Sequence, residues 1–273
     1  MESQTLSAIA AQIMAAQDSA QSLEPFSHRF DTLTLDAAYR VAALVNTQRV
    51  AQGWQPVGRK IGFTNHQLWE HFGVHQPIWA PVYAHNVHYA QDDKITCALN
   101  GFCEPRIEPE IIFHFTKTPP QNPTLAQLID SIDWCAFGYE IVQSHYPNWQ
   151  FTAADTIIDA GLHAALLVGQ PIPLEGLKGD IAQVLESCSV ELYCNHELKD
   201  QGSGANVLGG PLKALQHLVA LLATEHPTAP IRAGEVITTG TLTAVFPVAA
   251  GQRWHVIMPG FELPLLEVQF TNT

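Results

Sequence analysis

The chain has 273 residues, with 26 acidic and 13 basic side chains and a formal net charge of −13 at pH 7. It contains no cluster of lysine and arginine, so nucleic acid and anionic membranes are poor partners for it. Hydrophobic residues make up 47% of a chain that is long enough for a sizeable core, which indicates a globular protein. No apolar run approaches the ~20 residues of a membrane-spanning helix, and the first residues lack the basic start of a signal peptide. We therefore expect a cytoplasmic protein.

The N-terminal part of the chain favours helices. Residues 3–18 are rich in Ala, Gln, Ile and Met, which predicts a first helix. A second is predicted over residues 35–52, because Thr34 is a good N-cap and Gly53 a good terminator. A short helix is expected over residues 65–72. The first eighty residues are therefore predicted to be mostly helical.

Short strands separated by turn residues dominate the rest of the chain, interrupted by helices over residues 124–129 and 211–224. The predicted strands cover residues 87–89, 94–98, 107–115, 136–142, 164–169, 189–194, 235–239, 254–258 and 266–270. The sequence thus predicts an α+β protein, with a helical N-terminal portion over 1–80 and a β-rich core over 81–273.

Three glutamates, Glu108, Glu110 and Glu140, stand in apolar, β-branched runs. Side chains at i and i+2 of a strand point to the same face, so Glu108 and Glu110 are able to reach one cation. A third carboxylate from a neighbouring strand, Glu140, would complete an all-oxygen site suited to Mg²⁺ or Mn²⁺. The alternative is a solvent-facing strand side on which Arg106 is the only partner of the acids.

A second candidate is Lys60, which lies in the glycine-bounded apolar segment Val-Gly-Arg-Lys-Ile-Gly-Phe-Thr. A lysine near an apolar pocket can have a lowered pKa and transfer protons. The alternative is an edge-strand lysine whose amine extends to water.

Other patterns carry weaker signals. Asp155 and Asp159 have the spacing of a helical turn, and His163 enters an apolar run as a packed histidine. The glycine-rich stretch 202–211 fits no phosphate-binding motif, whereas the small hydroxyl residues of 238–243 suit close approach to a ligand. The five cysteines form no CxxC motif, and neither a zinc motif nor the GxSxG motif of serine hydrolases occurs.

Taken in order, several segments resemble the 2-oxopent-4-enoate hydratase and 4-oxalocrotonate decarboxylase group of the fumarylacetoacetate hydrolase superfamily, from about Leu35 to the C-terminus. The segments are Lys60-Ile-Gly-Phe-Thr, Arg106-Ile-Glu-Pro-Glu110, Glu140-Ile-Val, Asp155-Thr-Ile-Ile-Asp159, Gly204-Ala-Asn-Val-Leu-Gly-Gly-Pro-Leu and Thr239-Gly-Thr-Leu-Thr.

This resemblance implies a mixed β-roll core and a divalent metal, Mg²⁺ or Mn²⁺, that is chelated by the 2-oxo oxygen and carboxylate of the substrate. It implies that Lys60 transfers protons and that Thr241 lines the substrate side. Arg106 would either position a carboxylate or only neutralise the acidic cluster. The implied metal ligands are Glu108, Glu110 and Glu140.

Two departures from the family's pattern concern the pocket. The family's hydratases have Gln-Pro-Asp-Phe-Gly where this chain has Gln-Pro-Ile78-Trp-Ala, and Asp-Asn-Ala-Ser where it has Asp-Ala-Gly-Leu162. Apolar Ile78 and Leu162 thus replace a proton donor and a carboxylate-binding hydroxyl. A larger or less polar substrate tail, or different chemistry on the same metal, is therefore expected.

We expect a metal-dependent lyase, hydratase or decarboxylase, that acts on 2-oxo or 2-hydroxydienoic acids of aromatic-compound catabolism as a homo-oligomer. One alternative is a C–C bond hydrolase of acylpyruvate type, with His71 or His75 activating water. Another is a catalytically silent homologue that only binds oxoacids.

Overall fold

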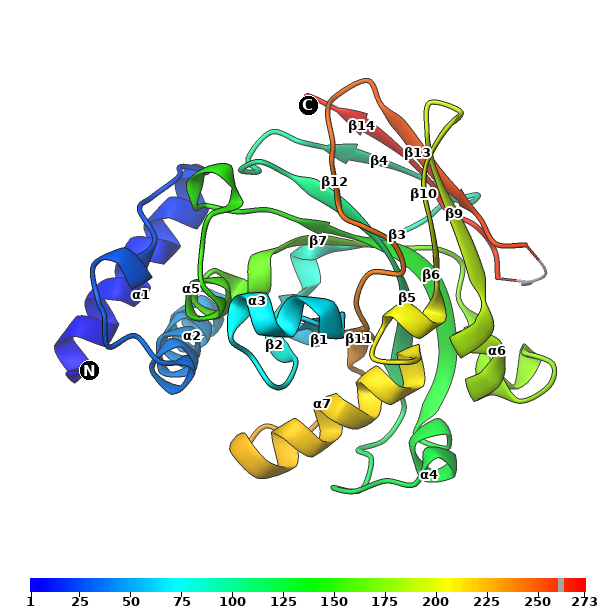
Figure 1. The fold of residues 1–273 in the computed structure, drawn as a ribbon, viewed down its shortest axis with the longest axis horizontal. Helices are drawn as coiled ribbons and strands as arrows, with labels where there is room; N and C mark the ends of the chain where they lie inside the picture. The colour runs from blue at the N-terminus through cyan, green and yellow to red at the C-terminus, as the bar shows by residue number, and fades with distance from the viewer. Residues whose placement is uncertain (260–262) are drawn as a thin grey trace.

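The computed structural model describes residues 1–259 and 263–273. It contains a large, curved mixed sheet and a smaller second sheet (Figure 1). The path of the large sheet is β2 (Ile78–Tyr83), β1 (Pro56–Gly62), β11 (Val236–Thr238), β5 (Arg106–Phe115), β6 (Ile132–Val142), β7 (His163–Val168) and β3 (Val87–Tyr89); β12 (Phe246–Pro247) pairs with β5 and β8 (Ile172–Pro173) with β6. The second sheet runs β10 (Glu197–Ser203), β9 (Ser189–Cys194), β13 (Arg253–Ile257), β14 (Glu267–Thr271) and β4 (Lys94–Ala98).

One cluster of helices lies at the end of the molecule opposite the second sheet (Figure 1). It consists of α1 (Ser3–Ser19), α2 (Leu35–Ala51) and α5 (Ala153–Ile158). Their apolar faces bury one another in a separate hydrophobic cluster, and the side chain of Thr34 caps α2 by accepting a hydrogen bond from the Ala37 amide. The remaining helices are α3 (Trp69–Phe72), α4 (Leu125–Ile129), α6 (Ile181–Ser187) and α7 (Pro211–Glu225), and the 3₁₀ turns are η1 (Phe26–His28), η2 (His66–Leu68), η3 (Ala84–Asn86), η4 (Pro147–Trp149), η5 (Ala160–Leu162), η6 (Leu174–Gly176) and η7 (Gly204–Asn206).

Helix α7 packs against one face of the large sheet. Its apolar side belongs to the same buried cluster as Ile107, Ile111 and Phe113 of β5. Within the described chain, the stretch 204–225 is the one helical segment that is long and apolar enough to cross a membrane, and 61% of its most apolar window is buried inside the fold. That burial is typical of a core helix in a globular domain.

The other face of β5 and β6 carries the residues that matter for function. Alternation along β5 sends Ile107 and Ile111 into the cluster with α7, and therefore sends Glu108 and Glu110 to the opposite side. On that side the sheet meets the segment around α5 and the turn that follows β11. The fold thus produces an acidic face inside the molecule, bordered by the N-terminal helical cluster.

The predicted α+β class with a β-roll core and a helical N-terminal portion is confirmed. The division at residue 80 stays a prediction, and the structure places β1 and the start of β2 in the large sheet although both belong to the predicted helical portion. Strands β2 and β10 and helix α6 were not predicted. All five cysteines are free, and none is exposed.

Candidate metal centre and active site

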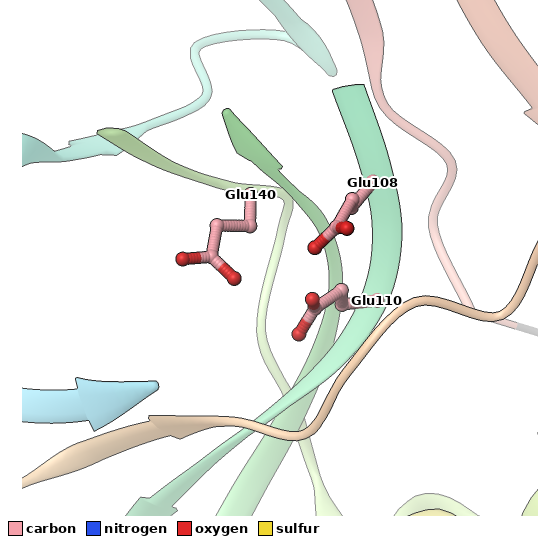
Figure 2. Close-up of side chains that lie close together, drawn as sticks. All are labelled: Glu108, Glu110 and Glu140. Atoms are coloured by element: carbon pink, nitrogen blue, oxygen red, sulfur yellow. The ribbon is translucent and has the colours of Figure 1, made fainter. Parts of the chain in front are cut away.

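The pairing register of β5 and β6 brings the three glutamates together. Glu108 and Glu140 are directly opposite each other in the antiparallel pair, and Glu110 lies two residues further along the same face. One carboxylate oxygen from each lies within 4.8 Å of the other two. Figure 2 shows the three side chains lying together on one side of the two strands. Glu110 and Glu140 are fully buried.

Glu140 is the member of the cluster that contacts Lys60 and His163. The ammonium Nζ of Lys60 on β1 lies 3.1 Å from Glu140 Oε2 and donates to the carbonyl of Gly161 at 2.9 Å. Nδ1 of His163 lies 2.7 Å from Glu140 Oε1 and donates to it, because a carboxylate only accepts. Burial alone would raise the pKa of Glu140, but Lys60 and His163 lower it below its usual range.

The same contacts decide the state of Lys60, which is 4% exposed. Burial favours the neutral amine, yet the fields of Glu140, Glu108 and Glu110 outweigh it and raise the pKa of Lys60 above its ordinary value. Without a cation in the cluster, the ammonium is therefore charged. Both interpretations of Lys60 from the sequence are therefore corrected. Its pKa is raised because three acids surround the amine, and β1 lies between β2 and β11, so Lys60 is a buried residue and not an edge-strand lysine that reaches water.

Glu110 is held from β11 and the turn that follows it. The hydroxyl of Thr238 donates to Oε2 of Glu110, and the amide of Gly240 donates to the same oxygen at 2.7 Å. A side chain at residue 240 would collide with Thr64, so this close approach requires glycine. Oε1 of Glu110 is buried and has no hydrogen-bond partner in the described chain.

Burial and the neighbouring carboxylates raise the pKa of Glu110 well above its usual range. A carboxylate oxygen without a partner, three acids and one lysine leave a deficit of positive charge. A hard divalent cation such as Mg²⁺ or Mn²⁺ fits this donor set, with Glu108, Glu110 and Glu140 as its protein ligands. The residues present therefore fit a metal.

A cavity of about 290 Å³ opens beside the acidic cluster and brings the sequence-predicted site residues together. Glu110 and Glu140 are not part of its wall, and neither are His71 and His75, which are exposed. Its lining includes Lys60, Ile78, Arg106, Glu108, Leu162 and Thr241.

The guanidinium of Arg106 is available for a ligand in this cavity. Its carbon Cζ lies 3.9 Å from the centre of the Trp149 ring, a cation–π contact, and no hydrogen bond or ion pair to the Arg106 side chain occurs in the described chain. Trp149 is fixed in turn, since its Nε1–H donates to the Glu104 carbonyl at 3.1 Å. Burial lowers the pKa of Arg106, although Glu104 and Glu108 oppose that shift. No sequence pattern indicated the role of Trp149.

Residues of two of the weaker motifs have structural roles. The carboxylate of Asp155 caps α5 and accepts from the amide and hydroxyl of Ser27. Asp159 accepts from both the amide and the ring of His145. Asn206, within the glycine-rich stretch, donates its amide to the carbonyl of Leu242 at 2.8 Å and so supports the turn after β11. None of these contacts forms a phosphate site.

Comparisons with known proteins agree with this fold and site. No family model matches the chain. The "TodF product hydratase" of Pseudomonas putida is 31% identical over 83% of this chain and 81% of its own length, and a 2-keto-4-pentenoate hydratase of Dechloromonas aromatica is 29% identical over 93% of both. A 4-oxalocrotonate decarboxylase of Pseudomonas putida G7, solved with magnesium and adipate, superposes with a TM-score of 0.88 at 27% identity, over 99% of this chain and 98% of that one.

The curved mixed sheet is a fold of the fumarylacetoacetate hydrolase type, and its acidic face fits a divalent cation, so the class of the protein is that of metal-dependent enzymes. A fumarylpyruvate hydrolase of Pseudomonas aeruginosa shares this fold, with a TM-score of 0.57 at 14% identity over 79% of this chain and 89% of its own. Within that class, the chain belongs to the 2-keto-4-pentenoate hydratase and 4-oxalocrotonate decarboxylase group. It is therefore a metal-dependent lyase.

Cation binding should depend on pH because two carboxyl groups of the site, those of Glu108 and Glu110, have raised pKa values and hold protons without a metal. Burial raises the pKa of Glu108 to about 7, despite the opposing field of Lys60, so at about pH 6 this group is mostly protonated. A cation must displace that proton. Calorimetry with Mn²⁺ in buffers of different ionisation enthalpy should therefore show proton release at about pH 6, less at about pH 8, and an affinity that rises between them. An affinity that is constant over this range would contradict the protonated state.

Proposed function

We propose that the chain is a Mg²⁺- or Mn²⁺-dependent hydratase or decarboxylase that acts in the cytoplasm on small 2-oxo or 2-hydroxydienoic acids from aromatic-compound catabolism. The observation that carries the proposal is the carboxylate trio beside a cavity, whose lining includes Glu108 of the trio, the buried Lys60 and Arg106. Such an arrangement binds a small acid next to a cation.

In this proposal Glu108, Glu110 and Glu140 hold the metal. When bound, the metal supplies Lewis-acid stabilisation of the negative charge that develops on the 2-oxo oxygen. Thr241 lines the side of the cavity that the substrate occupies, and Arg106 binds the substrate carboxylate through its free guanidinium edge.

Lys60 transfers the proton in this proposal. Its Nζ carries a proton in the resting site, lies at the cavity wall, and is oriented by Glu140 Oε2 and the Gly161 carbonyl. A group that is buried, oriented and within the cavity satisfies the geometric requirements of a general acid. The Gly161 backbone has a φ of +63°, and a side chain there would press on the Lys60 stem, so glycine leaves room for the lysine.

The hydrolase alternative requires a base that activates water. The sequence offered His71 and His75 for that role, and both are exposed and outside the cavity wall. The geometry therefore supports the lyase better. A silent binder would keep the metal site and lack turnover.

Product analysis separates these functions. Purified protein with Mg²⁺ and a panel of 2-hydroxydienoates and 2-oxoenedioates should convert at least one substrate, and mass spectrometry should show either a gain of water or a loss of carbon dioxide. Two shorter acids from one substrate would indicate the hydrolase, and unchanged substrates the silent binder.

Restoring the pocket acid should change the reaction. Ile78 is 3% exposed and lines the cavity where related hydratases carry a carboxyl group. Ile78→Asp should raise hydration of 2-hydroxypenta-2,4-dienoate by ~10²-fold or more, because general acid–base catalysis is typically worth ~10²–10⁴-fold. Burial should raise the pKa of the new acid, which suits a proton donor near neutral pH. Rates and melting temperature should be measured on one preparation; a stable variant with no gain would show that the missing acid is not decisive.

A further inference from the structure

The cavity beside the acidic cluster has an aromatic wall made by Phe63, Phe72 and Phe151. The ring centroids of Phe63 and Phe72 lie 4.8 Å apart. The rings of Phe72 and Phe151 stack with a centroid distance of 6.0 Å and an interplanar angle of 17°. All three side chains are only partly buried, and all three line the cavity. Partly exposed apolar rings in the lining of a cavity are a surface that an apolar ligand group would cover.

These rings come from three separate parts of the chain. Phe63 follows β1, Phe72 ends α3, and Phe151 lies between η4 and α5. Ile78 and Leu162 add aliphatic surface to the same cavity, and both are almost fully buried. The cavity therefore has an apolar wall at the two positions where the family's sequence pattern has polar groups.

Cations in the described cavity lining are confined to the acidic cluster. Lys60 is paired with Glu140, and Arg106 lies on the same strand face as Glu108 and Glu110. The described lining contains no other lysine or arginine and no histidine. A second carboxylate at the far end of a substrate would lose its hydration without gaining a cationic partner. The charge distribution thus suits one carboxylate per substrate.

We propose that this site selects 2-oxo and 2-hydroxydienoic acids with a single carboxylate and a bulky apolar tail, aryl or branched alkyl, that packs on the Phe63, Phe72 and Phe151 wall. This inference rests on the proposed function and specifies its substrate class. Leu162 and Ile78 are the specificity-determining residues. Dicarboxylates, including the 2-oxoenedioates of the decarboxylase reaction, are poor ligands of the site, so of the two proposed reactions this inference favours the hydratase.

Stable 2-oxo acids with different tails test the inference without turnover. The probes are 2-oxobutanoate, 4-phenyl-2-oxobutanoate and 2-oxoadipate, titrated by calorimetry into the protein with Mn²⁺ and again with EDTA. The phenyl compound should bind about 10-fold or more tightly than 2-oxobutanoate, because apolar groups in a fitted pocket contribute that much. 2-Oxoadipate should bind more weakly than the phenyl compound. Binding of the dicarboxylate as tightly as the phenyl compound, or no gain from the phenyl group, would overturn the inference.

Two variants locate the effect. Leu162→Ser places a hydroxyl in the apolar part of the cavity lining. It should reduce the ratio of the affinity for 4-phenyl-2-oxobutanoate to that for 2-oxobutanoate several-fold. Leu198→Ser makes the same chemical change on β10, where the side chain is 44% exposed and outside the cavity, and should leave the ratio as it is. An unchanged affinity ratio in Leu162→Ser would contradict the assignment of Leu162 as a specificity-determining residue.

The same titrations separate this inference from the proposed function. Binding of 2-oxobutanoate that requires Mn²⁺, together with the absence of a tail preference, would overturn only the tail inference. Binding of all three acids that is indifferent to EDTA would contradict the metal-dependent function itself, whatever the tail preference.

Discussion

Replacing Glu110 with glutamine should abolish tight binding of divalent cations. Glu110 is fully buried, its Oε1 has no partner in the described chain, and a hard cation depends on anionic oxygen ligands. The amide keeps the size of the side chain, so the loss would come from charge. We expect the affinity for Mn²⁺ to fall by roughly 100-fold or more, as measured by calorimetry.

Stability should distinguish this loss from misfolding. The pKa of Glu110 is raised in the absence of a cation, so its ionisation opposes folding at neutral pH and the neutral glutamine should not lower the melting temperature in EDTA. The stabilisation of the wild type by added Mn²⁺ should disappear in the variant. Glu175→Gln, at an exposed position, is the matched control and should retain it. Unchanged Mn²⁺ affinity in Glu110→Gln would remove this residue from the site.

Replacing Lys60 with methionine should lower turnover by about 10²–10⁴-fold, which is the usual contribution of a general acid or base. Methionine keeps most of the apolar stem, so in Mg²⁺ the melting temperature should change little. In EDTA the variant should be less stable, because Glu140 loses the ammonium at 3.1 Å and keeps its burial.

Cation binding supplies the second readout for Lys60. Removal of a positive charge beside the carboxylates should leave the Mn²⁺ affinity equal or higher, whereas a variant with damaged structure would bind more weakly. Lys94→Met, whose side chain is 73% exposed, serves as the control for the loss of a lysine. Activity of Lys60→Met within a few-fold of the wild type would exclude the proton-transfer role.

The acidic cluster was predictable because its geometry is local. The period of a strand places Glu108 and Glu110 on one face, and the apolar surroundings of Glu140 mark it as part of a buried neighbouring strand. The contact between His163 and Glu140 was not predictable, since it depends on the register between β6 and β7. The raised pKa of Lys60 likewise depends on acids from two other strands.

Elements at the margins of the fold were missed for physical reasons. Strand β2 lies at the edge of the large sheet, where Pro81 is tolerated. It was not predicted because a proline within a run argues against a strand. Strand β10 has no buried residue, so its sequence lacks the apolar alternation of a strand with one buried face. It is joined to β9 through Asn195 and His196, which both have positive φ as in a tight hairpin turn, but the usual glycine is absent.

The aromatic wall could not be derived from the sequence either. Phe63 and Phe72 lie near each other in the sequence, but many strands and helices separate them from Phe151. The three residues share no periodic pattern. Only the fold brings them to one cavity. Ile78 and Leu162 line the same cavity, so both add apolar surface beside the three rings. The sequence indicated that the pocket had become less polar, and the structure supplies the surface on which an apolar group would lie.

The central claim is that a metal held by Glu108, Glu110 and Glu140 is required for turnover. The most direct test follows the ultraviolet absorbance of 2-hydroxydienoates, with hydrogen, alkyl or aryl tails, in metal-depleted protein during titration with Mg²⁺. We expect no turnover after EDTA treatment and saturable recovery with Mg²⁺ for at least one substrate of the panel. Turnover that persists in EDTA, or none on any member of the panel at saturating Mg²⁺, would contradict it.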